Sequence, residues 1–185
     1  MPQGFAYHEG ALGPAQERGY VEQFAGLPFA PFEFHGFLGR RRIVSFGWRY
    51  DYAGRQLRPA TEPPAFLAAL RGVAAQAVGV DTERLQQILV TEYTLGAAIG
   101  WHRDKPMFED VVAVSFLAPC LLRFRRRQGD GWERRSIEVS PRSVYLLRGA
   151  ARREWEHSIP PVDRLRYSVT FRTFVSEPEP GQSHR

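Results

Sequence analysis

Two histidines and an aspartate in the second half of the chain have the residue types of a metal centre. His102 and Asp104 are separated by one residue, and His157 follows much later. Two histidines and one carboxylate that leave coordination positions open suit non-haem Fe(II). If their segment is extended, His102 and Asp104 point to one face, because strand side chains alternate. A folded β core must then bring His157 beside them. In the alternative interpretation, His157 is an ordinary core histidine, and His102 and Asp104 are surface residues that form hydrogen bonds.

Two arginines near the C-terminal end have the spacing of a carboxylate clamp. Arg166 and Arg172 flank the run 167–171, and their even separation places both on one strand face with Ser168 and Thr170. A guanidinium matches a carboxylate through two parallel hydrogen bonds, and burying it is costly without an anion. If this face is inward, a bound dicarboxylate supplies the charge; if it is exposed, both are ordinary surface residues. With an iron centre, the clamp indicates an oxygenase that uses 2-oxoglutarate.

The elements that must position these residues are mostly short strands. Six β-prone runs are separated by Gly, Pro and charged turns: 88–90, 111–116, 121–124, 136–139, 143–147 and 167–174. Closely spaced short strands favour a sandwich or jelly roll. Upstream, residues 14–24 and the Ala- and Leu-rich residues 65–78 are predicted helices. We therefore predict a mainly β (α+β) fold with N-terminal helices packed outside the β core.

Length and composition indicate one soluble domain. The 185 residues predict a single domain over 1–175, followed by a polar, Pro-rich tail, 176–185, that we expect to be disordered. The single cysteine, Cys120, fits a buried thiol in a reducing cytoplasm. The sequence shows no signal peptide and no membrane-spanning apolar stretch, so we expect a cytoplasmic monomer without a membrane partner. The net charge of +5 permits a nucleic-acid partner.

The order of these motifs resembles the AlkB family of Fe(II)/2-oxoglutarate dioxygenases. The resemblance covers about 90–174 and rests on His102-x-Asp104, on His157 followed by Ser-Ile, and on the two spaced arginines. Further similar features are Tyr93 three residues before Gly96, the strand 112–116, the Arg123-Phe124-Arg125 segment and, more loosely, Arg41 with Phe46-Gly47 and Tyr50-Asp51-Tyr52. It implies a double-stranded β-helix, a jelly roll, as a catalytic core over 88–174.

The resemblance also implies roles for individual residues. His102, Asp104 and His157 would be the catalytic iron ligands, with 2-oxoglutarate and O2 as co-substrates. Arg166, helped by the Tyr93 hydroxyl, would pair with the distal carboxylate of 2-oxoglutarate, and Arg172 would lie near the carboxylate that chelates iron. Thr91 and Ser168 stand at co-substrate positions where the family has Asn, and they have a shorter reach. After Asp104 the chain has Lys-Pro-Met in place of the family's acidic residue.

The resemblance implies oxidative demethylation of N-alkylated bases in DNA or RNA. Residues 1–60 would be the substrate-recognition region, with His35, Arg41, Trp48, Tyr50 and Tyr52 as contacts to the nucleic acid; alternatively, these aromatics form hairpin or core packing. The basic run 123–127 contacts phosphates or is a solvated turn. Two other functions stay open: an oxygenase acting on a protein or small molecule, and a non-catalytic nucleic-acid binder.

Overall fold

The computed structural model describes residues 1–34, 37–51, 54 and 56–178. Two predicted substrate contacts, His35 and Tyr52, lie outside the described residues, as does most of the predicted tail. None of the helices in this part of the chain has both the length and the apolar character needed to cross a membrane.

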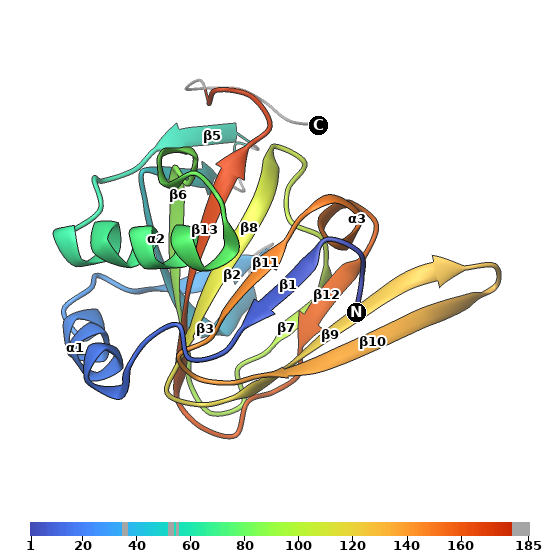
Figure 1. Ribbon diagram of the computed structural model, residues 1–185, viewed down its shortest axis with the longest axis horizontal. Helices are drawn as coiled ribbons and strands as arrows, with labels where there is room; N and C mark the ends of the chain where they lie inside the picture. Colours follow the sequence, from blue (N-terminus) through green and yellow to red (C-terminus); the bar gives the residue numbers. More distant parts are fainter. Residues whose placement is uncertain (35–36, 52–53, 55, 179–185) are drawn as a thin grey trace.

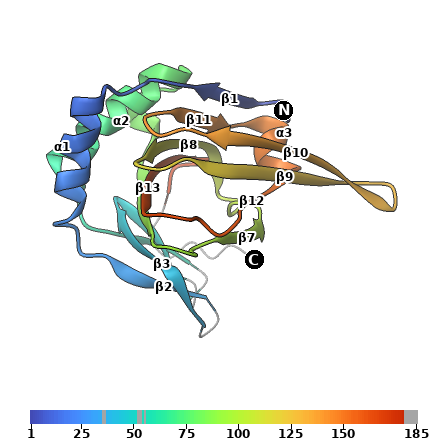
Figure 2. The same cartoon turned by 90° about the horizontal axis from the view of Figure 1, so that it is seen from below.

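Two antiparallel sheets face one another and form the predicted jelly roll (Figures 1 and 2). The large sheet contains, in spatial order, β1 (Phe5–His8), β11 (Val144–Leu147), β8 (Phe108–Phe116), β13 (Arg166–Phe174), β6 (Gln87–Tyr93), β3 (Phe37–Phe46) and β2 (Ala30–Phe34). The small sheet contains β10 (Gly131–Val139), β9 (Cys120–Gln128), β12 (Glu156–Ile159) and β7 (Ile99–His102). A separate pair joins β4 (Trp48–Asp51) to β5 (Gln56–Pro59).

The two predicted N-terminal helices cover the outer side of the large sheet (Figure 2). Helix α1 (Pro14–Phe24) has proline at its start, and the Gln16 side chain accepts a hydrogen bond from the Gly13 amide at 2.8 Å. Helix α2 (Ala65–Val78) ends at Gly79, whose φ of +66° is the left-handed conformation that favours glycine. Two short helices, η1 (Thr82–Arg84) and α3 (Gly149–Arg153), were not predicted.

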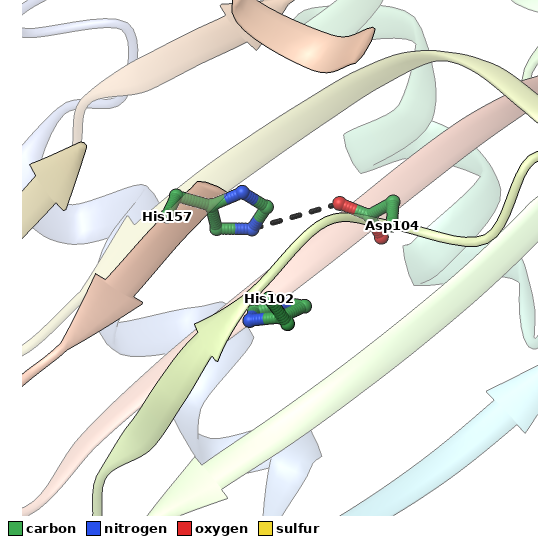
Figure 3. Close-up of side chains that lie close together, drawn as sticks. All are labelled: His102, Asp104 and His157. Atoms are coloured by element: carbon green, nitrogen blue, oxygen red, sulfur yellow. Dashed lines mark ion pairs between the residues drawn. The ribbon is translucent and has the colours of Figure 1, made fainter. Parts of the chain in front are cut away.

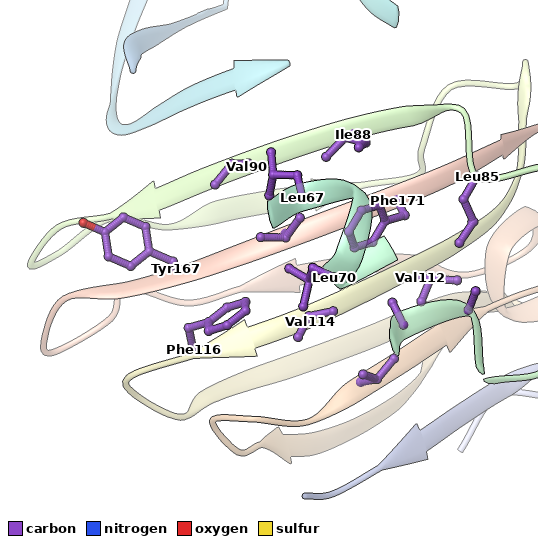
Figure 4. Close-up of a cluster of buried hydrophobic side chains, with 14 of the residues drawn as sticks. Leu67, Leu70, Leu85, Ile88, Val90, Val112, Val114, Phe116, Tyr167 and Phe171 are labelled. Atoms are coloured by element: carbon purple, nitrogen blue, oxygen red, sulfur yellow. The ribbon is translucent and has the colours of Figure 1, made fainter. Parts of the chain in front are cut away.

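Strand β13 alternates between two environments, as its sequence predicts. Tyr167, Val169 and Phe171 pack toward α2, where they join a buried cluster with Leu67 and Leu70 (Figure 4). Each fully buried side chain of this size contributes about 1.5–3 kcal/mol. The polar residues between them therefore point into the space between the sheets. This confirms that the two arginines share a face and shows that the face is the inward one, which the sequence left open.

The small sheet differs most from the sequence prediction. Strands β9 and β10 are longer than the predicted runs, and the basic run 123–127 lies within β9, so its interpretation as a turn was wrong. The hairpin turns at Gly129, whose φ is +56°. Propensity failed here because the arginines are held by cross-strand pairing rather than by apolar burial. Strands β1 and β12 were not predicted, whereas β7 is the extended segment that the sequence analysis considered for His102.

Candidate metal centre and co-substrate site

His102, Asp104 and His157 meet on the inward face of the small sheet (Figure 3). His102 ends β7 and His157 lies on the neighbouring antiparallel strand β12, where the two are direct register partners. Partners in register point to the same face. Asp104 follows two residues after the end of β7, in the loop, and one ligand atom from each of the three residues lies within 4.8 Å of the others.

A backbone contact sets the orientation of the His102 ring. Its Nδ1 lies 2.9 Å from the carbonyl oxygen of Gly100. A carbonyl only accepts, so Nδ1 carries the proton and Nε2 keeps its lone pair for a metal. The His102 and His157 ring centroids are 4.3 Å apart.

The His157 imidazole is kept neutral. Burial lowers its pKa to about 3, and the neighbouring His102 adds to the effect, while Asp104 opposes it. His157 Nε2 is 3.6 Å from Asp104 Oδ2, the contact drawn in Figure 3. At neutral pH this is not a salt bridge, because the ring is uncharged. The contact instead joins a neutral ring nitrogen and an anionic carboxylate oxygen. Metal binding requires both groups in these protonation states.

The other oxygen of Asp104 is held by Arg172. Arg172 Nε donates to Asp104 Oδ1 at 2.9 Å, and its Nη1 donates to Gln87 at 2.7 Å. Both side chains of the ion pair are largely buried, with 12% and 7% exposure. Burial by itself raises the pKa of Asp104, but Arg172 and the nearby cationic groups outweigh it and hold the pKa below its usual range. The carboxylate is therefore ionised and fixed.

A second buried arginine, Arg152 on α3, fixes the loop that carries Asp104. Its Nη2 donates to the carbonyl oxygens of Lys105 and Phe108, the latter at 2.8 Å. Burial lowers the pKa of Arg152, and Asp104 opposes that shift. Sequence analysis missed Arg152 because a short basic helix gives no signal that one of its arginines is buried.

Arg166 is the largest fully buried side chain, and part of its guanidinium has no partner. Nη2 donates to Ser115 Oγ at 2.8 Å, and the group lies 4.5 Å from the Tyr93 ring centroid. Within the described residues, Nε and Nη1 are buried and make no hydrogen bond. A buried cation with two orphaned donors is costly unless an anion meets it. The unpartnered donors at this end of β13 therefore fit a carboxylate.

The other predicted co-substrate residues surround Arg166. Tyr93 is its register partner on β6, and Ser168 pairs with Thr91 two residues further along. The Tyr93 and Ser168 hydroxyls are 3.4 Å apart. Ser115, which sequence analysis did not single out, joins them from β8. Its signal was a lone polar residue at an inward position of an otherwise apolar run.

The predicted substrate contacts fall into two places. Trp48 and Tyr50 pack beside Met107, in the loop that follows Asp104, and beside Phe108, the first residue of β8. Trp48 also makes an edge contact with Phe174, at 6.2 Å between centroids. Arg41 pairs in register with Tyr93 and lies over the Phe32 ring at 3.9 Å. These residues border the metal centre and the co-substrate residues, and their contact with a substrate stays a prediction.

The residues present fit both an iron ion and a dicarboxylate. Two imidazole nitrogens and one ionised carboxylate are the donor set that suits Fe(II) with open positions. The orphaned donors of Arg166 fit a carboxylate at the neighbouring position.

Comparison with known families agrees with this site. A family model described as the 2OG-Fe(II) oxygenase superfamily matches residues 31–172, which is most of the chain. The chain belongs to this superfamily, whose chemistry requires Fe(II), 2-oxoglutarate and O2. Within it the chain is AlkB-like, as its relatives indicate.

Two similar proteins carry AlkB names. An alkylated DNA repair protein ALKBH8 homolog of Arabidopsis thaliana is 26% identical over 162 residues, covering 74% of this chain and 47% of that protein. Bos taurus alpha-ketoglutarate-dependent dioxygenase alkB homolog 7, mitochondrial, is 30% identical over 125 residues, covering 66% and 56%. The chain spans about half the length of the curated relatives it matches.

Solved structures share the fold at low sequence identity. OsALKBH1 superposes with a TM-score of 0.67 at 17% identity, covering 94% of this chain and 97% of that one. A Trichoplax adhaerens prolyl hydroxylase bound to a peptide of hypoxia inducible factor gives 0.63 at 15% identity, with 92% and 83% covered. A 2OG-Fe(II) oxygenase family oxidoreductase of Burkholderia pseudomallei gives 0.68 at 14%, with 98% and 89% covered. These likenesses support the jelly-roll fold.

Proposed function

We propose that the protein removes N-linked methyl groups from bases in nucleic acid, using Fe(II), 2-oxoglutarate and O2. The observation that carries the oxygenase chemistry is the buried Arg166 with its orphaned donors. It shares a face of β13 with Arg172, which donates to Asp104 of the metal triad. The nucleic-acid substrate is supported by the AlkB-named relatives and by the net charge of +5.

Each residue of the site has one task in this reaction. His102, Asp104 and His157 would hold the iron, and Arg166 with Ser115 and Tyr93 would bind the distal carboxylate of 2-oxoglutarate. Arg172 keeps Asp104 ionised and oriented. With its co-substrates, bound iron supplies the oxidation: one oxygen atom enters succinate as CO2 leaves, and the other hydroxylates the methyl C–H bond. The resulting N-hydroxymethyl group then releases formaldehyde and leaves N–H on the base.

The base itself must be unstacked to reach the iron. Trp48 and Tyr50 lie beside the loop after Asp104, and Arg41 lies in register with Tyr93. We propose that the two aromatic rings border the methylated base and that Arg41 contacts the strand. The predicted contacts His35 and Tyr52 lie in the same upstream region and remain candidates for the same role.

Formaldehyde release tests this function. The substrates are single- and double-stranded DNA and RNA oligonucleotides that carry N1-methyladenine or N3-methylcytosine, each with its unmethylated counterpart. We expect release from at least one methylated substrate, and none from the His102→Ala variant. If succinate forms but no oligonucleotide yields formaldehyde, the oxygenase assignment holds and the nucleic-acid substrate is wrong; a protein or small-molecule substrate then takes its place.

A further inference from the structure

The outer face of the small sheet carries a stack of arginines and tryptophans that the iron chemistry does not use. Arg123, Arg125 and Arg127 alternate along β9, and Trp101 from β7 and Trp132 from β10 lie between them. Arg123 and Arg125 lie over Trp101, at 5.0 and 4.6 Å from the ring centroid. Arg125 and Arg127 lie over Trp132, at 4.2 and 4.9 Å. We call these five residues the arginine–tryptophan ladder.

The ladder lies on the opposite side of the strands from the metal centre. His157 pairs with Phe124 across β12 and β9, so the odd-numbered arginines of β9 point outward. Alternate residues of a strand are about 6.8 Å apart. The ladder therefore presents evenly spaced guanidiniums from the rim near His102 to the β9–β10 hairpin, which projects beyond the rest of the molecule (Figures 1 and 2).

This face has more positive than negative charge. Arg134 adds a fourth guanidinium, directly across from Arg125. Arg125 is paired with Glu156, and Arg123 donates to the Ser158 hydroxyl. In the part of the chain that the structure describes, no carboxylate lies within ion-pair distance of Arg123, Arg127 or Arg134.

The opposite face of the same hairpin is different. There Arg126 is paired with both Glu133 and Glu154, and Arg135 with Glu133. Both faces belong to the same two strands, so acidic residues could have neutralised the arginines of the outer face in the same way. Its uncompensated charge, held in a fixed row, instead fits a partner that carries a row of anions.

We propose that the ladder binds the phosphate backbone of the nucleic acid that carries the methylated base. Guanidiniums lie over both tryptophan rings, so we assign the rings the role of positioning arginines rather than of stacking on bases. They hold the guanidinium planes in place and leave N–H edges free for phosphate oxygens, which the flat arginine fork matches well. The ladder begins at Trp101, next to His102, so a strand lying on it would pass the rim of the metal centre. This proposal rests on the nucleic-acid substrate proposed above.

The test is binding of a labelled, unmethylated single strand of about 16 nucleotides, followed by fluorescence anisotropy at several salt concentrations. The variant Arg127→Gln/Arg134→Gln removes two exposed cations that have no carboxylate partner. We expect binding to weaken roughly tenfold and the slope of log K against log[salt] to fall by about 1.4. Arg127→Lys/Arg134→Lys keeps the charges and should keep most of the slope. Thermal unfolding checks that each variant is folded.

The matched control is Arg18→Gln/Arg84→Gln, which removes two exposed arginines near the helices on the large-sheet side. It should bind like the wild type. Wild-type affinity and slope in the Arg127/Arg134 variant would overturn the ladder proposal, as would a wild type that binds no oligonucleotide. Competition by polyglutamate as strong as by oligonucleotide would also overturn it and assign the face to an acidic protein.

The two proposals fail separately. If formaldehyde is released and the Arg127/Arg134 variant binds the oligonucleotide like the wild type, the ladder proposal is wrong and the demethylase function stands. Conversely, binding that depends on the ladder without formaldehyde release from any methylated strand would keep the ladder and remove the demethylase function.

Discussion

Arg166 begins strand β13 and Arg172 lies near its other end, on the same face, yet their surroundings differ. Arg172 already has its anion within the protein, because Asp104 and Gln87 accept its hydrogen bonds. Arg166 has one hydroxyl partner and two buried donors that no described residue satisfies.

The difference separates positioning from binding. An arginine whose donors are all paired within the protein stabilises the structure. A buried arginine with unpaired donors can instead bind an anionic ligand. The sequence pattern treated both as one clamp, because strand parity places them alike. The contacts indicate that Arg172 acts on Asp104, the proposed metal ligand, and that Arg166 is the stronger candidate for the distal carboxylate.

Removing Arg172 should give the largest effect on stability. Arg172→Met leaves Asp104 buried without its cation, and we expect the metal-free protein to lose about 3–5 kcal/mol of unfolding free energy. Urea unfolding measures this. The control Arg164→Met breaks an exposed pair with Asp163 and should change stability by less than about 0.5 kcal/mol. A loss below about 1 kcal/mol in Arg172→Met would mean that Asp104 does not depend on this partner.

Removing Arg166 should leave the fold but weaken co-substrate binding. Arg166→Met removes a buried cation with unsatisfied donors, so the metal-free protein should be as stable as the wild type or more so. The dissociation constant for 2-oxoglutarate should rise about 100-fold, because a charge-assisted pair is lost. An anaerobic titration that follows the visible charge-transfer band of the iron complex measures it. A loss of stability as large as that of Arg172→Met would contradict the contrast between the two arginines.

A smaller effect should appear in the pH dependence of stability. The native pKa of His157 is about 3, below its ordinary value of 6.5. Between these pH values the unfolded chain binds a proton that the native protein rejects, so stability falls as pH falls. From pH 7 to 5 the loss from this group is about 2 kcal/mol.

The variant His157→Gln isolates this contribution. Metal-free wild type and variant are unfolded in urea at pH 7 and pH 5, and the variant should lose less stability between the two. Asp104 does not interfere in this window, because its pKa is lowered and it titrates only at more acidic pH. Equal losses in both proteins would show that His157 accepts a proton in the native state.

Local patterns predicted much of this molecule. Both N-terminal helices were predicted with their observed bounds, because Pro and Gly mark their ends. That Arg166 and Arg172 share one face of β13 followed from alternation, which did not decide whether this face is inward. His102 and Asp104 were paired correctly because they are neighbours in the chain.

Contacts between distant segments could not be predicted in the same way. No local pattern specifies that Arg172 meets Asp104 or that buried Arg152 holds the loop after it. The β9–β10 hairpin was underestimated for a related reason. The arginines of β9 contact Trp101 of β7 and Trp132 of β10, and this arrangement exists only after folding.

The position of β7 at the edge of the small sheet has a consequence for how the protein responds to iron. In the described chain, β7 pairs only with β12, and the two histidines lie directly across that single strand pair. A metal ion bound by both would act as a cross-link that fastens an edge strand to its neighbour. Loss of iron would then remove this cross-link as well as the reactivity, and β7 could open locally at the edge of the sheet. Binding of iron would keep β7 ordered.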